Sequence, residues 1–280
     1  MFAKINNSWN LIKASARVLS ADKEFIIFPL LSSIALLIVT ISFAIPMFAT
    51  DFFDQLLGGK SQSIYYIVLF LFYVVQYTVI FFVNSALIGA ALIRLRGGDP
   101  TVGDGFRIAF GHFGKILGYA LIAATVGLIL KWISDRSSSL GRIVTSLIGL
   151  AWNLATYLVV PVLITEEVGP LESVKRSAAY LKKTWGEQIV GNFSIGFVFG
   201  LLSILIMVFG VSIFILAATA ESIAGMILIG VVVVLALILL SLISNTLQSI
   251  YVAAVYQYIA QGQTGGFFSK EQIEGAFRLK

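Results

Sequence analysis

The sequence predicts an all-α polytopic membrane protein, a bundle of six transmembrane helices joined by short loops. Three observations predict this fold class: the composition, the number of long apolar runs, and the uneven distribution of Lys and Arg. Of the 280 residues, 59% are hydrophobic and only 12% are charged, and the mean hydropathy is +0.97. A soluble domain averages about 45–50% apolar and about 25% charged residues. The apolar excess therefore favours a protein embedded in a bilayer.

Six apolar runs are long enough to cross a bilayer, because a hydrocarbon core of ~30 Å requires about 20 helical residues. The loops between the runs are short, so we expect residues 1–280 to form a single integral membrane domain. The last run is longer than one crossing requires, and the sequence leaves open whether it is one continuous helix. The expected spans are residues 25–49, 64–93, 116–133, 143–165, 189–219 and 223–259.

The distribution of Lys and Arg predicts the orientation of these spans. One set of segments, on alternate sides of the spans, holds 15 of the 19 basic residues, and the other set holds four. By the positive-inside rule the first set is cytoplasmic, which places both termini in the cytoplasm. The basic set consists of residues 1–24, 94–115, 166–188 and 260–280.

Each basic segment contains the pattern of an amphipathic helix. In residues 170–187, the apolar residues Leu171, Val174, Ala178 and Leu181 recur every three or four positions, opposite a charged face. Similar helices are expected at about 8–20, 101–115 and 269–280. Such helices lie at the membrane interface and attract anionic lipid. The residues expected to contact lipid or a partner are Lys13, Arg17, Arg107, Lys115, Lys175, Arg176, Lys182, Lys183 and Trp185.

Two of these helices carry signals for their first residue. Thr101 and Asp104 have the spacing of a capping box, with Asp in the position that Glu usually takes. Ser269 is a candidate cap for the last helix. Both signals predict helices that begin just after the capping residue.

The amphipathic segments also resemble one another in sequence. "KASARVL" at 13–19 and "KRSAAYL" at 175–181 share Lys, Ser, Ala and Leu in register. This similarity suggests a three-fold internal repeat, in which each unit is an amphipathic helix, an outgoing span and a returning span. The alternative is that similar local physics selects similar residues, and the sequence leaves both open.

One stretch resembles a known family. The segment "VVPVLITEEVGPLESVKRSAAYLKKTWGEQIVGNFSIGF", residues 159–197, has a Pro near the end of a span, an acidic-Gly junction and an Arg-Ser helix ending at a Trp. It resembles the bacterial membrane domain found in some glycerophosphodiester phosphodiesterases and in stand-alone uncharacterised integral membrane proteins. The resemblance implies a six-span domain of the bacterial inner membrane. It brings no catalytic domain and no site residues.

Neutral polar residues recur on the second, fourth and sixth spans, which are the returning ones. They have two interpretations: hydrogen bonds between helices, or a polar path or solute site. No Asp, Glu, Lys, Arg or His lies well inside a span, which argues against proton coupling through such a group. The candidate residues of the polar stripe are Gln76, Asn84, Asn153, Asn245, Gln248 and Ser249.

The residue inventory argues against enzymatic chemistry. The chain has no cysteine and one histidine, His112, which argues against a zinc-thiolate site, a multi-histidine site and a catalytic triad. Glu166 and Glu167 are interpreted as a solvated helix end rather than an acid–base pair. We therefore expect no enzyme, no metal and no cofactor. The net charge of +5 gathers at the membrane surface, which favours anionic lipid over nucleic acid as a partner.

Two functions remain in competition. The first hypothesis is a non-enzymatic membrane-organising or accessory protein that binds anionic lipid or a partner through its basic helices. The alternative is a passive channel or transporter for a neutral or amphipathic solute, suggested by the polar stripe. The sequence leaves open whether the partner is another membrane protein or a second copy of the chain.

Overall fold

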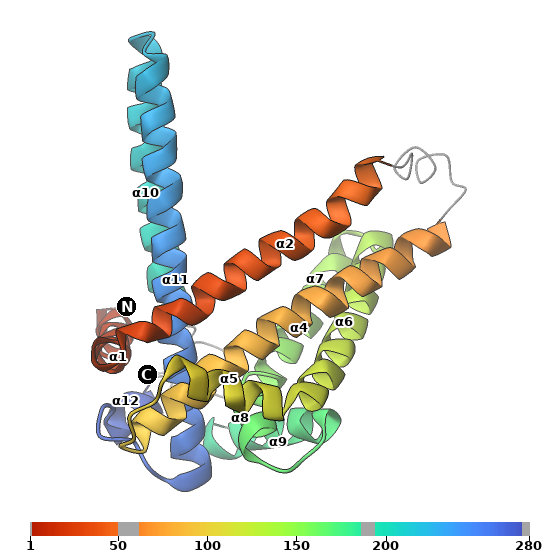
Figure 1. Ribbon diagram of the computed structural model, residues 1–280, viewed down its shortest axis with the longest axis vertical. Helices are drawn as coiled ribbons and strands as arrows, with labels where there is room; N and C mark the ends of the chain where they lie inside the picture. The colour runs from red at the N-terminus through yellow and green to blue at the C-terminus, as the bar shows by residue number, and fades with distance from the viewer. Residues whose placement is uncertain (1, 50–61, 186–193, 276–280) are drawn as a thin grey trace.

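A computed structural model describes residues 2–49, 62–185 and 194–275, which are helices joined by short connections (Figure 1). Six helical segments in these ranges are long and apolar enough to cross a membrane. No strand occurs in the described ranges. The expected all-α membrane fold is therefore confirmed.

The helices follow one another in a pattern that occurs three times, a helix from a basic segment and then two membrane-length segments. The pattern matches the expected units, but their common origin stays a prediction. The first unit contains α1 (Phe2–Ala21), the 3-10 turn η1 (Lys23–Ile26), α2 (Ile27–Ala49) and α4 (Gln62–Leu95). The second contains α5 (Val102–Gly111), α6 (Phe113–Arg136), α7 (Ser139–Ala155) and α8 (Val159–Thr165). The third contains α9 (Pro170–Trp185), α10 (Ser194–Thr219) and α11 (Ile223–Gln261), and α12 (Lys270–Gly275) follows it.

One expected boundary is wrong, one expected span contains a break, and one open question is settled. The amphipathic helix at 101–115 ends at Gly111, because His112 leaves helical geometry (φ −114°, ψ 14°), so Lys115 belongs to the span helix α6. The expected span 143–165 is interrupted between α7 and α8. The last span is a single helix, α11, of 39 residues. The start of the expected span at 189 lies outside the described residues.

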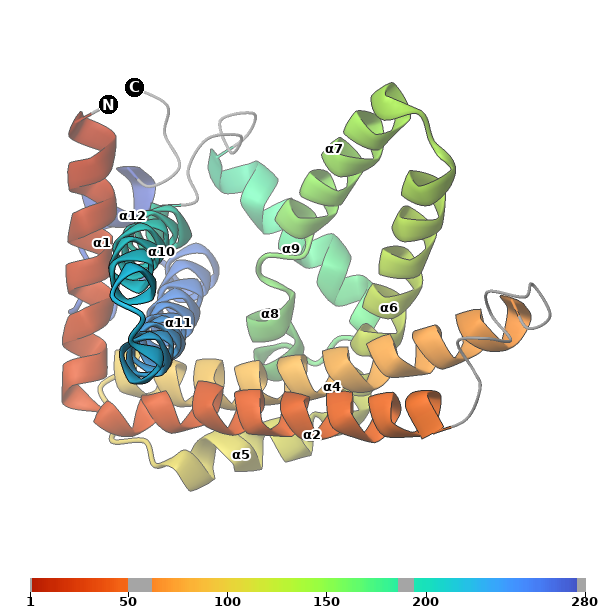
Figure 2. The same cartoon turned by 90° about the horizontal axis from the view of Figure 1, so that it is seen from above.

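Three long helical hairpins diverge from a common base (Figures 1 and 2). The hairpins are α2 with α4, α6 with α7, and α10 with α11. We call base the end of the molecule that holds α1, α5, α8, α9, α12 and the adjoining ends of α4 and α11. The described parts of the four basic segments all lie at the base, and the connections from α6 to α7 and from α10 to α11, which hold few basic residues, lie toward the opposite ends of their hairpins. The basic and the less basic segments thus alternate between the two ends of the molecule, as the charge distribution predicts. That the base faces the cytoplasm stays a prediction.

The buried core lies at the base, and small residues allow its helices to approach closely. Ala86 and Ala90 on α4, and Ala253 and Ala254 on α11, are almost fully buried in one apolar cluster. Close backbone contact through small residues is the usual way in which helices associate in membranes. Away from the base the apolar side chains are exposed, as Phe48 at 78% illustrates, so these surfaces are suited to lipid.

Both capping signals are confirmed. The Thr101 hydroxyl accepts a hydrogen bond from Asp104 N–H at 3.2 Å, and the Asp104 carboxylate accepts one from Thr101 N–H at 3.0 Å. Ser269 and Gln272 exchange the same pair of bonds at 3.2 and 2.9 Å. Two of the three returning spans are thus followed by a helix with a reciprocal cap.

The expected apolar face of α9 is partly wrong. Leu171 is 59% exposed, whereas Ser173 and Ser177 are fully buried. Hydroxyl side chains this small permit close packing and can bond to the neighbouring backbone, so they serve as the contact face of a helix at a crowded base. The side chain of Trp185, one of the residues expected to contact lipid or a partner, is outside the described residues.

Candidate functional site

A cavity of about 580 Å³ lies among α4, α6, α7, α8 and α11. Five of the six residues of the expected polar stripe line it. The exception is Gln76, whose amide donates a hydrogen bond to Thr40 Oγ1 of α2 at 2.9 Å. The lining residues of the stripe are Asn84 from α4, Asn153 from α7, and Asn245, Gln248 and Ser249 from α11.

Gln76 and the other amides of the stripe differ in their hydrogen bonds. Gln76 joins two helices, as the hydrogen-bonding interpretation predicts. No hydrogen bond connects the side-chain amides of Asn84, Asn153, Asn245 or Gln248 to another described residue. An amide has two donor hydrogens and an acceptor oxygen, so these four groups can bond to water or a ligand in the cavity.

The interruption of the fourth span lies at the cavity wall. Helix α7 ends at Ala155 and α8 begins at Val159, and the intervening Thr156 and Tyr157 line the cavity. Non-helical backbone at membrane depth is tolerated where it is buried in protein or borders a water-filled cavity. Here the Leu158 N–H donates to the Ser177 hydroxyl of α9 at 2.9 Å, which satisfies one backbone group that the break releases. The sequence reasoning missed this break and Ser177.

The cavity lining is polar but uncharged. None of its lining residues is Asp, Glu, Lys, Arg or His. Aromatic rings occupy much of the remaining wall. Tyr77 and Phe81 stack along α4 with centroids 5.7 Å apart, and the Phe81 ring lies 4.5 Å from that of Tyr119 on α6. The lining thus combines amides, hydroxyls and aromatic surfaces.

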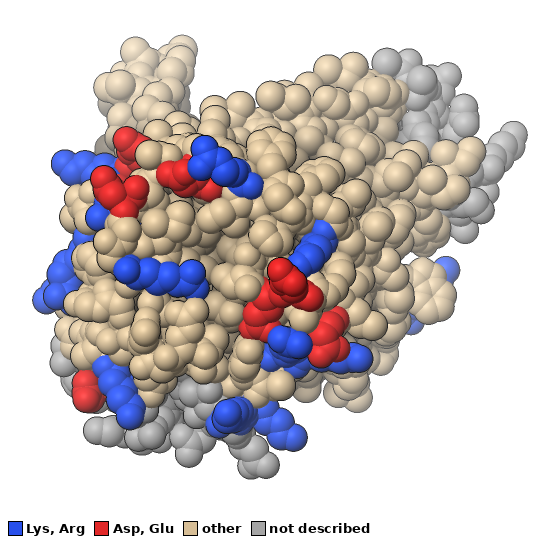
Figure 3. All heavy atoms as spheres, turned by 60° about the horizontal axis from the view of Figure 1, so that its bottom comes forward, with Lys and Arg blue, Asp and Glu red and all other residues tan. Residues whose placement is uncertain are grey.

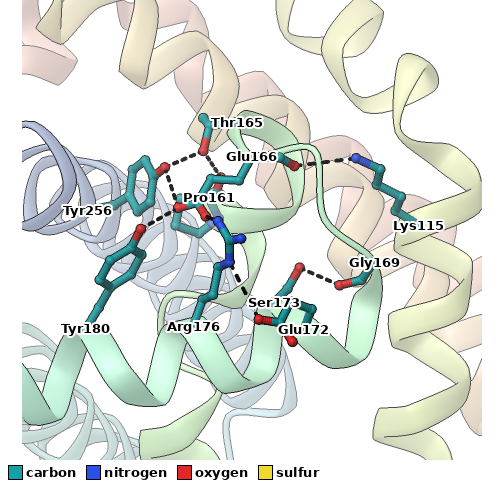
Figure 4. A network of polar contacts seen from close by, with 10 residues as sticks. All are labelled: Lys115, Pro161, Thr165, Glu166, Gly169, Glu172, Ser173, Arg176, Tyr180 and Tyr256. Carbon is teal, nitrogen blue, oxygen red and sulfur yellow. Dashed lines mark hydrogen bonds and ion pairs between the residues drawn. The ribbon is translucent and has the colours of Figure 1, made fainter.

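A network of polar contacts centred on Glu166 lies just beyond α8 (Figure 4). Its carboxylate accepts hydrogen bonds from Tyr180 of α9 at 2.9 Å and Tyr256 of α11 at 3.0 Å, and it pairs with Arg176 of α9. Lys115 of α6 reaches the Glu166 carbonyl at 3.4 Å. The Glu166 side chain is only 13% exposed, so its interpretation as a solvated helix end is wrong. The network fastens α6, α9 and α11 to the end of α8.

The surroundings of Glu166 shift the pKa values of its partners on α9. A hydrogen bond to Glu166 raises the pKa of Arg176 and so keeps its positive charge. Burial raises the pKa of the Tyr180 phenol, and its hydrogen bond to Glu166 adds to the effect. Both shifts favour the protonated forms that the network requires, and they matter at alkaline pH. The i,i+4 spacing of Arg176 and Tyr180, which places them on one face of α9, was the available sequence signal.

A second ion-pair cluster at the base also escaped the sequence reasoning. Arg94, at the end of α4, pairs with both Asp22 and Asp99. Asp22 precedes η1 and its side chain is 9% exposed, so the pair ties the entry of the first span to the exit of the second. This ion-pair cluster stabilises the base, and none of its residues lines the cavity.

Most of the basic residues expected to contact lipid have protein partners. Figure 3 shows acidic residues intermixed with the basic ones over the base. The Arg17 guanidinium donates to the Phe267 carbonyl at 2.7 Å, Arg107 pairs with Asp104 at 2.7 Å, and Lys175 lies 3.7 Å from Glu172. Lys13 lies over the Trp9 ring at 5.6 Å. Lys182 and Lys183 are exposed and form no ion pair with another described residue.

Comparison with known proteins adds the family. A model of a family of unknown function, DUF6159, matches residues 63–267, which include the cavity lining and the Glu166 network. The chain belongs to DUF6159. No curated protein and no solved structure matches the chain. The DUF6159 match also contains the segment 159–197, whose resemblance to the phosphodiesterase-linked membrane domain stays a prediction.

Proposed function

We propose that this DUF6159 protein binds an amphipathic molecule with an uncharged polar headgroup in the cavity and lets it pass through the membrane. The observation that carries the proposal is the meeting of Asn84, Asn153, Asn245 and Gln248, from three helices, at one cavity without hydrogen bonds to other described residues. Leaving polar groups unbonded in an apolar medium is costly, so an occupant that bonds to them is favoured.

The cavity extends over part of the depth that passage requires. Along α4 its lining runs from Tyr77 to Ile88. Eleven residues at a rise of ~1.5 Å make about 17 Å of helix, more than half of a ~30 Å hydrocarbon core. A headgroup that enters such a cavity has already crossed much of the apolar barrier.

The arrangement of the hairpins supports entry from the side. Helices α7 and α11 both line the cavity, and on the side that faces away from α4 the helix between them is α9, which lies at the base (Figures 1 and 2). Asn153 and Asn245 are exposed on these two lining helices. A lipid-like molecule can therefore place its headgroup among the amides while its chains stay in the bilayer. The lining has no Asp, Glu, Lys, Arg or His to couple to protons, so we expect passage to be passive.

Native mass spectrometry of the protein released from its own membrane tests this proposal. We expect an amphipathic molecule at a fixed stoichiometry, lost when Asn245 and Gln248 are both replaced by Leu. The matched control is Gln76→Leu, which changes an amide on a returning span that does not line the cavity. Retention of the same molecules by the double variant would contradict the proposal.

Anionic-lipid binding at the base is a second candidate function, in which the protein organises membrane components. The exposed Lys182 and Lys183 favour it, because each basic residue near an anionic surface contributes about 1 kcal/mol. Replacing both by Glu should weaken the association of the full-length protein with anionic lipid, measured by native mass spectrometry of the protein released from nanodiscs that contain anionic and neutral lipid. Unchanged association would remove this candidate.

A further inference from the structure

We infer that the headgroup held in the cavity is rich in hydroxyl groups, as in a lipid that carries a sugar or another polyol. This inference rests on the proposed function and narrows its ligand class. It depends on three features of the site: the absence of charge in the lining, the direction of the α7 end, and the chemistry of the lining side chains.

The first feature argues against phosphate and ammonium headgroups. The lining contains no charged residue, and the nearby Glu166 and Arg176 are already paired with each other. A charged group transferred from water to this cavity would lose hydration and gain no opposite charge. An uncharged headgroup avoids that cost.

The second feature is the break in the fourth span. Helix α7 ends where Thr156 and Tyr157 line the cavity, so its C-terminal end lies at the cavity wall, although the Trp152 and Leu154 carbonyls already accept hydrogen bonds from the Thr156 and Tyr157 N–H groups. A helix C-terminus carries partial negative charge, which disfavours a phosphate and favours a hydrogen-bond donor. The Leu158 N–H, just before α8, donates to Ser177, and the Val159 N–H, the first of α8, donates to the Thr156 carbonyl at 3.1 Å.

The third feature is the match between amides and hydroxyl groups. Each Asn or Gln side chain presents donors and an acceptor side by side, and a hydroxyl group both donates and accepts. The four unbonded amides can thus hold several adjacent hydroxyl groups at once. Trp152, Tyr77 and Tyr119 add aromatic surface to the same lining. The faces of such rings carry partial negative charge and attract the polarised C–H groups of a sugar ring.

The size of the cavity fits such a headgroup. Its volume of about 580 Å³ lies within the range of ~300–1,000 Å³ that is usual for small-ligand sites. Glycines contribute space on two walls, because Gly127 of α6 and Gly149 of α7 both line the cavity. A ring with its hydroxyl groups can be enclosed without displacing the helices.

A lipid-exchange assay tests the ligand class. The full-length protein is reconstituted into phosphatidylcholine vesicles that contain one of three lipids labelled on an acyl chain with nitrobenzoxadiazole: monoglucosyl diacylglycerol, phosphatidylglycerol or phosphatidylcholine. Dithionite bleaches the label in the outer leaflet, and the slow phase reports movement between leaflets. We expect the protein to increase the rate at which the glucosyl lipid moves between leaflets at least about tenfold more than the rate for either phospholipid. One additional hydrogen bond to the bound headgroup provides about this factor.

Variants separate the ligand class from the proposed function. Asn245→Leu with Gln248→Leu should abolish the acceleration, and Gln76→Leu should retain it. Gln248→Lys, which keeps the site polar but charges it, should reverse the preference toward phosphatidylglycerol. If all three lipids move equally fast and the double variant stops them all, passage through the cavity stands, but its restriction to uncharged headgroups and the ligand class are both wrong. If none moves faster than in protein-free vesicles, or the double variant moves them as well as the natural chain, the proposed function and the ligand class are both wrong.

Discussion

The Ser177 hydroxyl of α9 accepts a hydrogen bond from the Leu158 N–H at the break between α7 and α8. A side chain from the third unit therefore satisfies a backbone group that the second unit releases. Leu158 and Ser177 are both fully buried, so water does not replace this contact in the folded chain. The break at the cavity wall depends on the docking of α9.

Replacing Ser177 by Ala should destabilise the protein by about 1–3 kcal/mol, the cost of an unsatisfied buried donor. Ser173→Ala is the matched control, because Ser173 is equally buried but donates only to the Gly169 carbonyl at the start of its own helix. Thermal unfolding in detergent, followed by size-exclusion fluorescence, measures the difference. Equal losses in the two variants would show that the Leu158 contact has no special weight.

Glu166→Gln should lower the free energy of unfolding by about 1–3 kcal/mol, because it removes the charge that pairs with Arg176 and weakens the bonds from two tyrosines. Its neighbour provides the control, since Glu167 is exposed. Glu167→Gln should change the stability by less than about 0.5 kcal/mol, as usual for surface positions. Chemical denaturation of both variants decides whether Glu166 is the structural centre of the network.

Alkaline pH should weaken the base through Tyr180. Because its pKa is raised in the folded protein, the unfolded chain ionises first, and stability is lost as the pH rises above about 10. Tyr180→Phe cannot ionise, so its melting temperature should fall less steeply between pH 9 and pH 11, from a lower starting value at pH 7. Parallel pH profiles for the two proteins would contradict this role.

Gly105→Ala should loosen the contact of α5 with α4. A Cβ atom at this position would lie 2.6 Å from the Ala86 carbonyl oxygen and 2.8 Å from the Phe28 ring. Backbone cannot yield as a flexible side chain can, so we expect a loss of about 1–3 kcal/mol. Gly111→Ala, where no atom lies within 4 Å of the added group, should be neutral or stabilising in the same melting assay.

The chain has no cysteine, so single cysteines can report whether the cavity is wet. Gln248→Cys should react with a water-soluble methanethiosulfonate, because the reactive species is the thiolate and it requires water. Leu239→Cys, on the exposed apolar part of the same helix, should stay unreactive in vesicles. Equal labelling of the two positions, measured by mass shift, would contradict a water-filled cavity.

Hydropathy and residue spacing predicted the long helices, because the length and apolarity of a span are properties of consecutive residues. The polar stripe was predicted for the same reason, and the structure brings Asn84, Asn153 and Asn245 together although they lie far apart in the chain. Glu166 and Ser177 were not predicted. Their roles depend on partners from other helices, and no local pattern distinguishes a buried carboxylate from a solvated one.

The divergence of the three hairpins gives the bilayer itself control over the cavity. The three hairpins contact one another mainly at the base, and their apolar outer halves diverge. Helices α7 and α11 can therefore tilt relative to each other at little cost in packing. A helix that exceeds the local hydrocarbon thickness tilts to match it. Thin membranes should therefore spread these walls and thick membranes should draw them upright, which makes the width of the lateral opening a function of lipid chain length.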